Sequence, residues 1–342
     1  MKYFSTFSGI GGFELGITQA YDNRPNIRNR SEVLRETMPD TQESQDRFTC
    51  VGYSEIDKYA TSIYQKHFPN HKNYGDITTI IAEDLPDFDL LVGGFPCQSF
   101  SIAGKRGGFN DTRGTMFFEL ARILRAKQPR LFVFENVKGL LSHDGGRTFA
   151  TIIQTLDELR YDVQWQIINS KNHGVPQNRE RVFIIGHSRG TRRPEVFPFG
   201  DNPEAVTQLS GQHSNTLTTR YYGGQANRTY VTESKLNAQE IVQLNQPTHS
   251  NDRVYGTDGL SPTLNTMQGG NRQPFIPEDS RIRRLTPTEC ERLQGFPDHF
   301  TKYGVDDQGQ EVLISDTQRY KVLGNAVTTN VITAIGERLL TS

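Results

Sequence analysis

Short apolar runs alternate with stretches of helical spacing through residues 1–190, and this alternation constrains the fold more than any other feature of the chain. The expected strands are Lys2–Phe7, Cys50–Ser54, Phe88–Val92, Arg130–Phe134, Val163–Ile168 and Arg181–Ile185. Helices are expected over Phe13–Ile17, Thr115–Ala126 and Thr148–Leu159. Such alternation is typical of an α/β fold in which helices cover both faces of a mostly parallel sheet.

Polar and glycine-rich turns follow several of these strands, at Ser8–Gly12, Ser54–Asp57, Gly93–Cys97 and Glu135–Asn136. Ligands of open α/β sheets bind beyond the carboxyl ends of the strands, so these turns mark the expected site. Glycines in the first turn would let the backbone approach a ligand, although a tight strand-to-helix turn accounts for them equally well. The turn lacks the spacing and the Lys-Ser/Thr pair of a Walker loop. Glu55, in the position of a ribose-binding acid, then favours a nucleoside-bearing cofactor other than a nucleoside triphosphate.

Composition excludes several other classes of protein. A length of 342 residues predicts two domains at about 150 residues each. The net charge of −1 and the 23% charged residues fit a soluble globular protein. No apolar run approaches the roughly 18 residues that a membrane span needs, and the first residues do not resemble a secretory signal. We therefore expect a cytoplasmic protein without a membrane partner.

Three cysteines, Cys50, Cys97 and Cys290, are too few and too scattered for a disulfide framework or a zinc site. The expected setting is a reducing cytosol, and no metal is expected. Cys50 and Cys290 are expected to be buried and inert. Cys97 differs, because Gly93-Gly94-Phe95-Pro96-Cys97 presents it on a stiff turn at the sheet edge. A thiolate there would be a good nucleophile once its pKa is lowered.

The second half of the chain has a different texture. Residues 191–280 are rich in Thr, Asn, Gln, Gly, Ser and Pro, with a helix expected only at Ser234–Leu244. Residues 214–228 resemble residues 261–272, which favours two related hairpins, although chance similarity remains an alternative. Helical patterning returns over Arg281–Gly295, starting from Thr286-Pro287-Thr288-Glu289, and a loop and a helix are expected over Tyr320–Leu340. Residues 22–47 are interpreted as a surface insertion, partly helical around Ser31–Glu36.

This pattern predicts a larger lobe of residues 1–190 with 318–342, a smaller β-rich lobe of residues 191–284, and a hinge of residues 285–317.

The motif order resembles that of the DNA (cytosine-5)-methyltransferases over nearly the whole chain, except residues 22–48 and much of 195–280. The matching segments are Phe4–Gly12, Glu55, Asp76, Pro96-Cys97, Glu135-Asn136-Val137, Gln177–Arg181, Arg284–Pro297 and Gly324–Val327. The chain departs from the family at Ser5-Thr6-Phe7, where Asp-Leu-Phe is commoner, and at Ala326, where Ser is usual. The resemblance implies a Rossmann-like methyltransferase sheet and a small, β-rich target-recognition domain.

The resemblance also implies a chemistry, the transfer of a methyl group from S-adenosylmethionine to C5 of a flipped-out cytosine. Cys97 would attack C6 of the base and make C5 nucleophilic. Glu135 would contact N3 and the 4-amino group, which requires a partly neutral carboxylic acid. Arg179 and Arg181 would bind O2 or order the site, and the family suggests Arg181 for O2. On the residues alone, Glu135 would be a helix-terminal carboxylate and the two arginines surface ion pairs.

Two larger sets of residues complete the site that the resemblance implies. Cofactor contacts are expected from Phe7, Ser8, Gly9, Ile10, Gly12, Glu55, Ile56, Asp76, Ile77, Gly94, Pro96, Leu120, Asn325 and Ala326. DNA contacts are expected from Gln98, Ser101, Lys105, Arg106, Arg220, Arg228, Arg253, Thr263, Leu264 and Arg272. Residues 98–112 have the glycines and cations of a loop that closes over DNA, and Thr263-Leu264 resembles the family's recognition core.

Other functions remain open. A tRNA cytosine-5-methyltransferase would share the fold, but that branch's Cys-Phe-Thr signature is absent. A catalytically silent DNA-binding regulator would have lost Cys97 or Glu135, and both are present. An amino-methyltransferase lacks its Asn/Asp-Pro-Pro-aromatic motif here, and a thiol hydrolase would need His143 or His173 as a partner for Cys97. The expected partner is double-stranded DNA, with a cognate restriction endonuclease as a functional associate. A monomer is expected, in a bacterial or phage-infected cytoplasm.

Overall fold

The computed structural model describes residues 1–23, 48–96, 116–192, 194–199, 208–209, 240–246, 253–257, 259–266, 273–278 and 281–341. Its strands are β1 (Lys2–Thr6), β2 (Thr49–Ser54), β3 (Leu90–Gly94), β4 (Leu131–Val137), β5 (Tyr161–Asn169), β6 (Gln177–Asn178), β7 (Glu180–Ser188), β8 (Gln208–Leu209), β9 (Ser261–Pro262), β10 (Phe275–Glu278), β11 (Arg281–Arg284), β12 (Tyr303–Val305) and β13 (Glu311–Leu313). Its α-helices are α1 (Gly12–Asp22), α3 (Lys58–His67), α4 (Met116–Lys127), α5 (Arg147–Glu158), α7 (Pro287–Leu293), α8 (Asp316–Asn325) and α9 (Thr329–Thr341). Short 3-10 helices are η1 (Ile77–Thr79), η2 (Ala82–Asp84), η4 (Lys138–Leu141), η5 (His143–Gly146) and η6 (Ser170–His173).

A central sheet has the strand order β2-β1-β3-β4-β7-β5-β8. β2, β1, β3 and β4 pair in parallel, whereas β7 is antiparallel to both β4 and β5. β5 therefore runs in the same direction as β4, and the sheet is mostly parallel, as the sequence predicted. The reversed β7 lies beside β4, which brings the start of β7 to the carboxyl end of β4.

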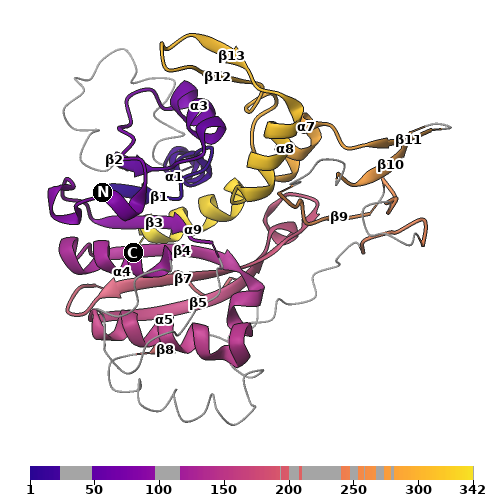
Figure 1. Ribbon diagram of the computed structural model, residues 1–342. Helices are drawn as coiled ribbons and strands as arrows, with labels where there is room; N and C mark the ends of the chain where they lie inside the picture. The colour runs from indigo at the N-terminus through magenta and orange to yellow at the C-terminus, as the bar shows by residue number, and fades with distance from the viewer. Residues whose placement is uncertain are drawn as a thin grey trace, which may run out of the picture.

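Helices cover both faces of this sheet (Figure 1). Because successive side chains of a strand point to opposite faces, Phe4 packs with α4 and α5, and Tyr3 packs with α1 and α9. On β3, Leu91 likewise packs on the face covered by α4 and α5, and Leu90 packs on the face covered by α1 and α9. The two-sided apolar burial confirms the predicted α/β class with helices on both faces.

A third apolar core joins the hinge-side elements to the sheet lobe. It contains residues of α7 and α8 together with Ile10, Ile63 of α3 and Leu264. Residues 285–326 therefore pack directly on the first glycine-rich turn. Within the described part of the chain, no helix is both long enough and apolar enough to cross a membrane.

Several elements differ from the sequence prediction. Arg281–Arg284 is strand β11, paired antiparallel with β10, and the helix expected there begins only at Pro287. The capping box of Thr286 and Glu289 fixes that start, because each side chain satisfies a backbone N–H of the other residue.

The loop expected after Tyr320 is also wrong, because α8 runs from Asp316 to Asn325 before α9 begins. Its apolar residues are few, so its sequence pattern is weak, but Val322 and Leu323 are buried. Helix α3 was not predicted. The described end of the helix expected at Ser234–Leu244 is not helical, since Gln243 forms an isolated antiparallel bridge with Tyr255.

Candidate active site

Gly94 and Glu135 are partners in the register of the parallel strands β3 and β4. A Cβ atom added to Gly94 would lie 2.9 Å from Glu135 Oε2, so the Glu135 carboxyl group occupies the space that a side chain would fill. A glycine at the end of β3 thus lets the Glu135 side chain lie over the carboxyl edge of the sheet.

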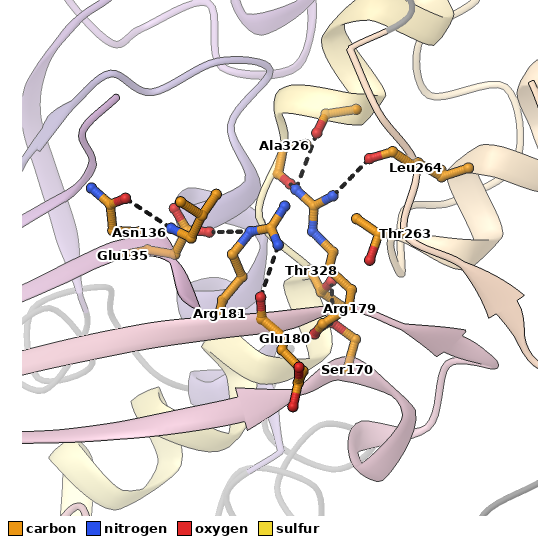
Figure 2. A network of polar contacts seen from close by, with 12 residues as sticks. Glu135, Asn136, Ser170, Arg179, Glu180, Arg181, Thr263, Leu264, Ala326 and Thr328 are labelled. Atoms are coloured by element: carbon orange, nitrogen blue, oxygen red, sulfur yellow. Dashed lines mark hydrogen bonds and ion pairs between the residues drawn. The ribbon is translucent and has the colours of Figure 1, made fainter. Parts of the chain in front are cut away.

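Arg181 of β7 faces the same carboxyl group from the neighbouring strand. Its Nε lies 3.0 Å from Glu135 Oε1, and both side chains are largely buried (Figure 2). Burial raises the pKa of Glu135, while the charges of Arg181 and Arg179 oppose that rise. A carboxyl group with this balance holds its proton to a higher pH than an exposed one, and can donate or accept a hydrogen bond.

Asn136 fixes the turn that leads to Cys97. Its Nδ2 donates to the carbonyl oxygen of Phe95 over 2.8 Å, and its Oδ1 accepts from the N–H of Val137 over 2.8 Å. Phe95 is buried and Pro96 is exposed at the sheet edge. The backbone of Gly94 and Phe95, which leads to Cys97, is therefore held next to Glu135 and Asn136.

Arg179 lies two residues before Arg181 and has a different environment. Its guanidinium donates to three backbone carbonyls, those of Leu264 (3.1 Å), Gly324 (3.1 Å) and Ala326 (2.8 Å). Only 2% of the residue is exposed. Arg179 therefore joins the sheet to two distant segments, in keeping with the ordering role that was one of its two expected roles.

The glycine-rich turn after β1 is held against Glu55. The N–H of Gly9 donates to Glu55 Oε2 over 2.8 Å, and the N–H groups of Ile56 and Asp57 donate to Oε1, each over 2.8 Å. Ile56 itself is 72% exposed, which is unusual for a large apolar side chain. A fixed carboxylate and an exposed apolar surface thus lie side by side at the end of β2.

Asn73 connects the next loop to the same edge, and no sequence pattern predicted this role. Its side chain accepts from the N–H of Gly75 over 2.9 Å and donates to the carbonyl of Glu55 over 3.2 Å. Asp76 follows, and the N–H and hydroxyl of Thr78 lower the pKa of its exposed carboxyl group. Asp76 is thus placed near the Glu55 loop as a charged, accessible acid.

The last of the expected cofactor motifs packs on the first. A Cβ atom on Gly12 would lie 2.8 Å from Val327 Cγ2, so the two segments are in close contact. Asn325 is exposed there and Ala326 is buried. Among the other expected cofactor residues, Phe7 has a positive φ of 50°, Ser8 is buried and bonded to Ser5, and Ile10, Ile77 and Leu120 belong to the apolar cores.

The expected DNA-contacting residues are only partly described. Thr263 is exposed and its hydroxyl donates to the carbonyl of Asn178 over 2.7 Å, Leu264 is buried, and Arg253 is exposed. Outside the described residues lie Cys97, Gln98, Ser101, Lys105, Arg106, Arg220, Arg228 and Arg272. The first hairpin echo and residues 24–47 of the expected insertion also lie there.

Two further polar residues, Gln294 and Thr328, were not among the expected site residues, although Gln294 lies in the matching segment Arg284–Pro297. Gln294 is fully buried and donates to the carbonyl of Leu323 over 2.9 Å. Thr328 donates to Gln294 Oε1 over 2.9 Å and contacts the Ser170 hydroxyl over 2.8 Å. Among the described residues, no group of three or more His, Cys, Asp or Glu side chains is placed to hold a metal ion.

Comparisons with family models, curated proteins and solved structures show what this chain is similar to. The family model for C-5 cytosine-specific DNA methylases matches residues 1–341. The Type II methyltransferase M.SsoII of Shigella sonnei is 38% identical, over 100% of this chain and 80% of that protein. M1.ScrFI of Lactococcus lactis subsp. cremoris, another Type II methyltransferase, is 37% identical, over 99% of this chain and 78% of that protein. The crystal structure of a putative DNA modification methyltransferase encoded within an Escherichia coli prophage shares the fold, with a TM-score of 0.62 at 19% identity over 100% of this chain and 99% of that one.

Proposed function

Because the chain belongs to the C-5 cytosine-specific DNA methylase family, we propose that it transfers a methyl group from S-adenosylmethionine to C5 of a cytosine flipped out of double-stranded DNA. The observation that carries the proposal is the largely buried pair of Glu135 and Arg181 beside the turn that leads to Cys97. The pair offers a hydrogen-bonding acid and a cation at one edge of the sheet. These are the groups that a pyrimidine with ring nitrogens and a carbonyl requires.

Cys97 supplies the nucleophile in this proposal. C5 of cytosine is too weak a nucleophile to accept a methyl group directly. Addition of the Cys97 thiolate to C6 pushes electron density onto C5, which would take the methyl group as its bond to the sulfonium sulfur breaks and S-adenosylhomocysteine leaves. Loss of the C5 proton to a base such as water then restores the double bond between C5 and C6 and expels the thiolate. The turn held by Asn136 places the backbone before Cys97 next to Glu135, which supports this assignment.

Glu135 and Arg181 act on the base during the addition. Negative charge develops on the ring as sulfur adds, and a protonated Glu135 neutralises it by donating to N3. Arg181 holds the Glu135 carboxyl group in position and has further N–H groups to donate to O2. Burial raises the pKa of Glu135, which favours the protonated form that this step needs.

The residues at the ends of β1 and β2 fit an adenosine cofactor. Glu55 is a fixed acceptor for ribose hydroxyls, and the exposed Ile56 is an apolar surface for a base. Asp76, Gly94 and Asn325 would complete the contacts. When bound, S-adenosylmethionine supplies an electrophilic methyl group on a sulfonium sulfur.

The target is proposed to be a short sequence in duplex DNA. A base within a duplex is out of reach of a thiolate, so it must be flipped out at a cost of a few kcal/mol. The loop of residues 98–112 and the lobe of residues 191–284 are proposed to close on the DNA and to read its sequence. A cognate restriction endonuclease in a bacterial or phage-infected cytoplasm belongs to the same proposal, and the names of the Type II relatives support it. Action as a monomer is also proposed.

Methylation of genomic DNA tests the proposal. Purified protein is incubated with S-adenosylmethionine and unmethylated bacterial DNA, which is then sequenced by a method that resolves 5-methylcytosine. We expect methylation at one short motif, abolished by Cys97→Ala. If the folded wild type binds cofactor and leaves no 5-methylcytosine, the proposal fails. A tRNA substrate is then tested in the same assay.

A further inference from the structure

Arg179 lies where three segments that are remote in the sequence meet. From its place between β6 and β7, it binds the recognition segment, residues 259–266, through the Leu264 carbonyl, and the end of α8 through the Gly324 and Ala326 carbonyls (Figure 2). A guanidinium has five N–H groups in a fixed plane, so it can hold several carbonyls at defined angles. One side chain therefore sets the distance between the recognition segment and α8.

The recognition segment is seated closely on both neighbours. Ser261 and Pro262 pair in parallel with Gln177 and Asn178, and the Thr263 hydroxyl adds a bond to the Asn178 carbonyl. A Cβ atom on Gly324 would lie only 2.0 Å from the carbonyl oxygen of Asn265. The end of α8 therefore contacts the recognition segment with no room for a side chain between them.

Gln294 holds the same end of α8 from the other side. It donates to the carbonyls of Leu323 and Ala326, and Thr328 donates to it. Within the described part of the chain, its side-chain hydrogen bonds do not reach the recognition segment. Gln294 and Arg179 thus share the Ala326 carbonyl but differ in whether they also hold residue 264.

We propose that Arg179 is a positioning residue that couples the seating of the recognition segment on DNA to the shape of the cofactor-binding end of α8. The inference rests on the proposed function, which assigns DNA to the recognition segment and cofactor to Asn325 and Ala326. A shift of the Leu264 carbonyl would leave a buried charged donor without its acceptor, so Arg179 and the Gly324 and Ala326 carbonyls move with it. Binding at either site then favours binding at the other, by the same factor.

The test measures this coupling with S-adenosylhomocysteine, which cannot donate a methyl group, and a duplex carrying the sequence that the wild type methylates. The Kd for S-adenosylhomocysteine is measured with and without the duplex. We expect the duplex to tighten it at least about fivefold in the wild type. The coupling ratio is the Kd for S-adenosylhomocysteine without the duplex divided by the Kd with it. In Arg179→Lys, which keeps the charge and loses the planar set of donors, this ratio should fall below about twofold.

Gln294→Met is the matched control. It removes hydrogen bonds to α8 and leaves the bond of Arg179 to Leu264, so its ratio should match that of the wild type even if its Tm falls. A wild-type ratio near one, or an unchanged ratio in Arg179→Lys, overturns the inference. Absence of 5-methylcytosine with the wild type is a separate result, because it removes the proposed function itself.

Gly324→Ala provides a second variant in case Arg179→Lys does not fold. Its added Cβ pushes the recognition segment from α8 without changing any charge. We expect the ratio to fall here as well. A wild-type ratio in folded Gly324→Ala would overturn the inference without reference to Arg179→Lys.

Discussion

Glu135 and Arg181 form an ion pair across the adjacent strands β4 and β7, with 3.0 Å between Oε1 and Nε. The pair exists because β7 is inserted antiparallel beside β4, in a register that sets Val137 opposite Arg181. Glu135 lies two residues before Val137 on β4, so it is a diagonal neighbour of Arg181. Long side chains at diagonal positions of an antiparallel pair of strands still reach each other. The antiparallel direction of β7 is thus the structural reason that the Glu135 carboxyl group and the Arg181 guanidinium meet at this edge of the sheet.

Replacement of Glu135 by Gln tests the acid. Glu135→Gln keeps the shape and removes the proton that the carboxyl group supplies to N3. We expect the single-turnover rate of methylation to fall about 10²- to 10³-fold, with much smaller changes in the Kd for DNA. Because burial raises the Glu135 pKa, wild-type rates should also decline as pH rises through it. That decline should be absent in the variant.

Glu180→Gln is the control for this change. Glu180 lies one residue before Arg181 and pairs with Lys138 in a partly exposed position. Its neutralisation should change neither the rate nor the pH profile appreciably. Equal losses in the two variants would argue against a specific role for Glu135.

Gly94→Ala tests the space that the Glu135 carboxyl group occupies. The added Cβ would lie 2.9 Å from Oε2 and would displace the carboxyl group from its position. We expect a loss of about tenfold or more in methylation rate at unchanged secondary structure, because small displacements of a reacting group are costly. Gly139→Ala is the control, since its Cβ would meet nothing within 4 Å. A wild-type rate for Gly94→Ala would contradict the placement of Glu135.

Glu14 of α1 makes stability depend on pH. It is fully buried, and burial raises its pKa from 4.5 to about 7 against the opposing hydrogen bonds of Ser5 and Tyr64. Between these two values the unfolded chain releases a proton that the folded chain keeps, so rising pH lowers the free energy of unfolding. Between pH 5 and pH 8 the loss should be on the order of 2–3 kcal/mol.

Urea denaturation of Glu14→Gln at both pH values isolates this contribution. Between pH 5 and pH 8, the free energy of unfolding of the variant should fall less than that of the wild type, by about 2–3 kcal/mol. The lowered pKa of His173, caused mainly by burial, acts in the opposite direction, so the difference between variant and wild type is the quantity to compare. Glu158→Gln, at an exposed position, should keep the wild-type dependence. A parallel pH dependence of Glu14→Gln and wild type would show that Glu14 is charged in the folded protein.

Local patterns in the sequence were enough to predict much of the fold. The strands β1 to β5 and β7 lie within a few residues of their predicted positions, and the capping box of Thr286 marks the start of α7. The structure brings Gly94, Glu135 and Arg181 together, while their expected roles toward cofactor and base stay predictions. These features depend on local residue pattern or on a shared fold, and both can be read from one chain.

The remaining features depend on contacts that no local pattern encodes. Arg179 binds the carbonyls of Leu264 and Ala326, and a backbone carbonyl has no signature that marks it as an acceptor for a residue 85 positions away. α8 has too few apolar positions to show a helical period, and its packing against α7 and Leu264 stabilises it. Strand β11 has a charged sequence that resembles a helix surface, and its pairing with β10 decides otherwise.

The exposed Ile56 gives the sharpest test of the cofactor site. A large apolar side chain that is 72% exposed adds little to folding, so Ile56→Ala should leave the Tm within experimental scatter. If this surface covers the adenine of the cofactor, the Kd for S-adenosylhomocysteine should rise about tenfold, the effect of losing roughly 1–2 kcal/mol of apolar burial. Ile81 is 62% exposed and serves as the matched control, because Ile81→Ala removes the same atoms away from Glu55. Equal affinities in the two variants would place the adenine elsewhere, whereas weaker binding in Ile56→Ala alone would assign it to the end of β2.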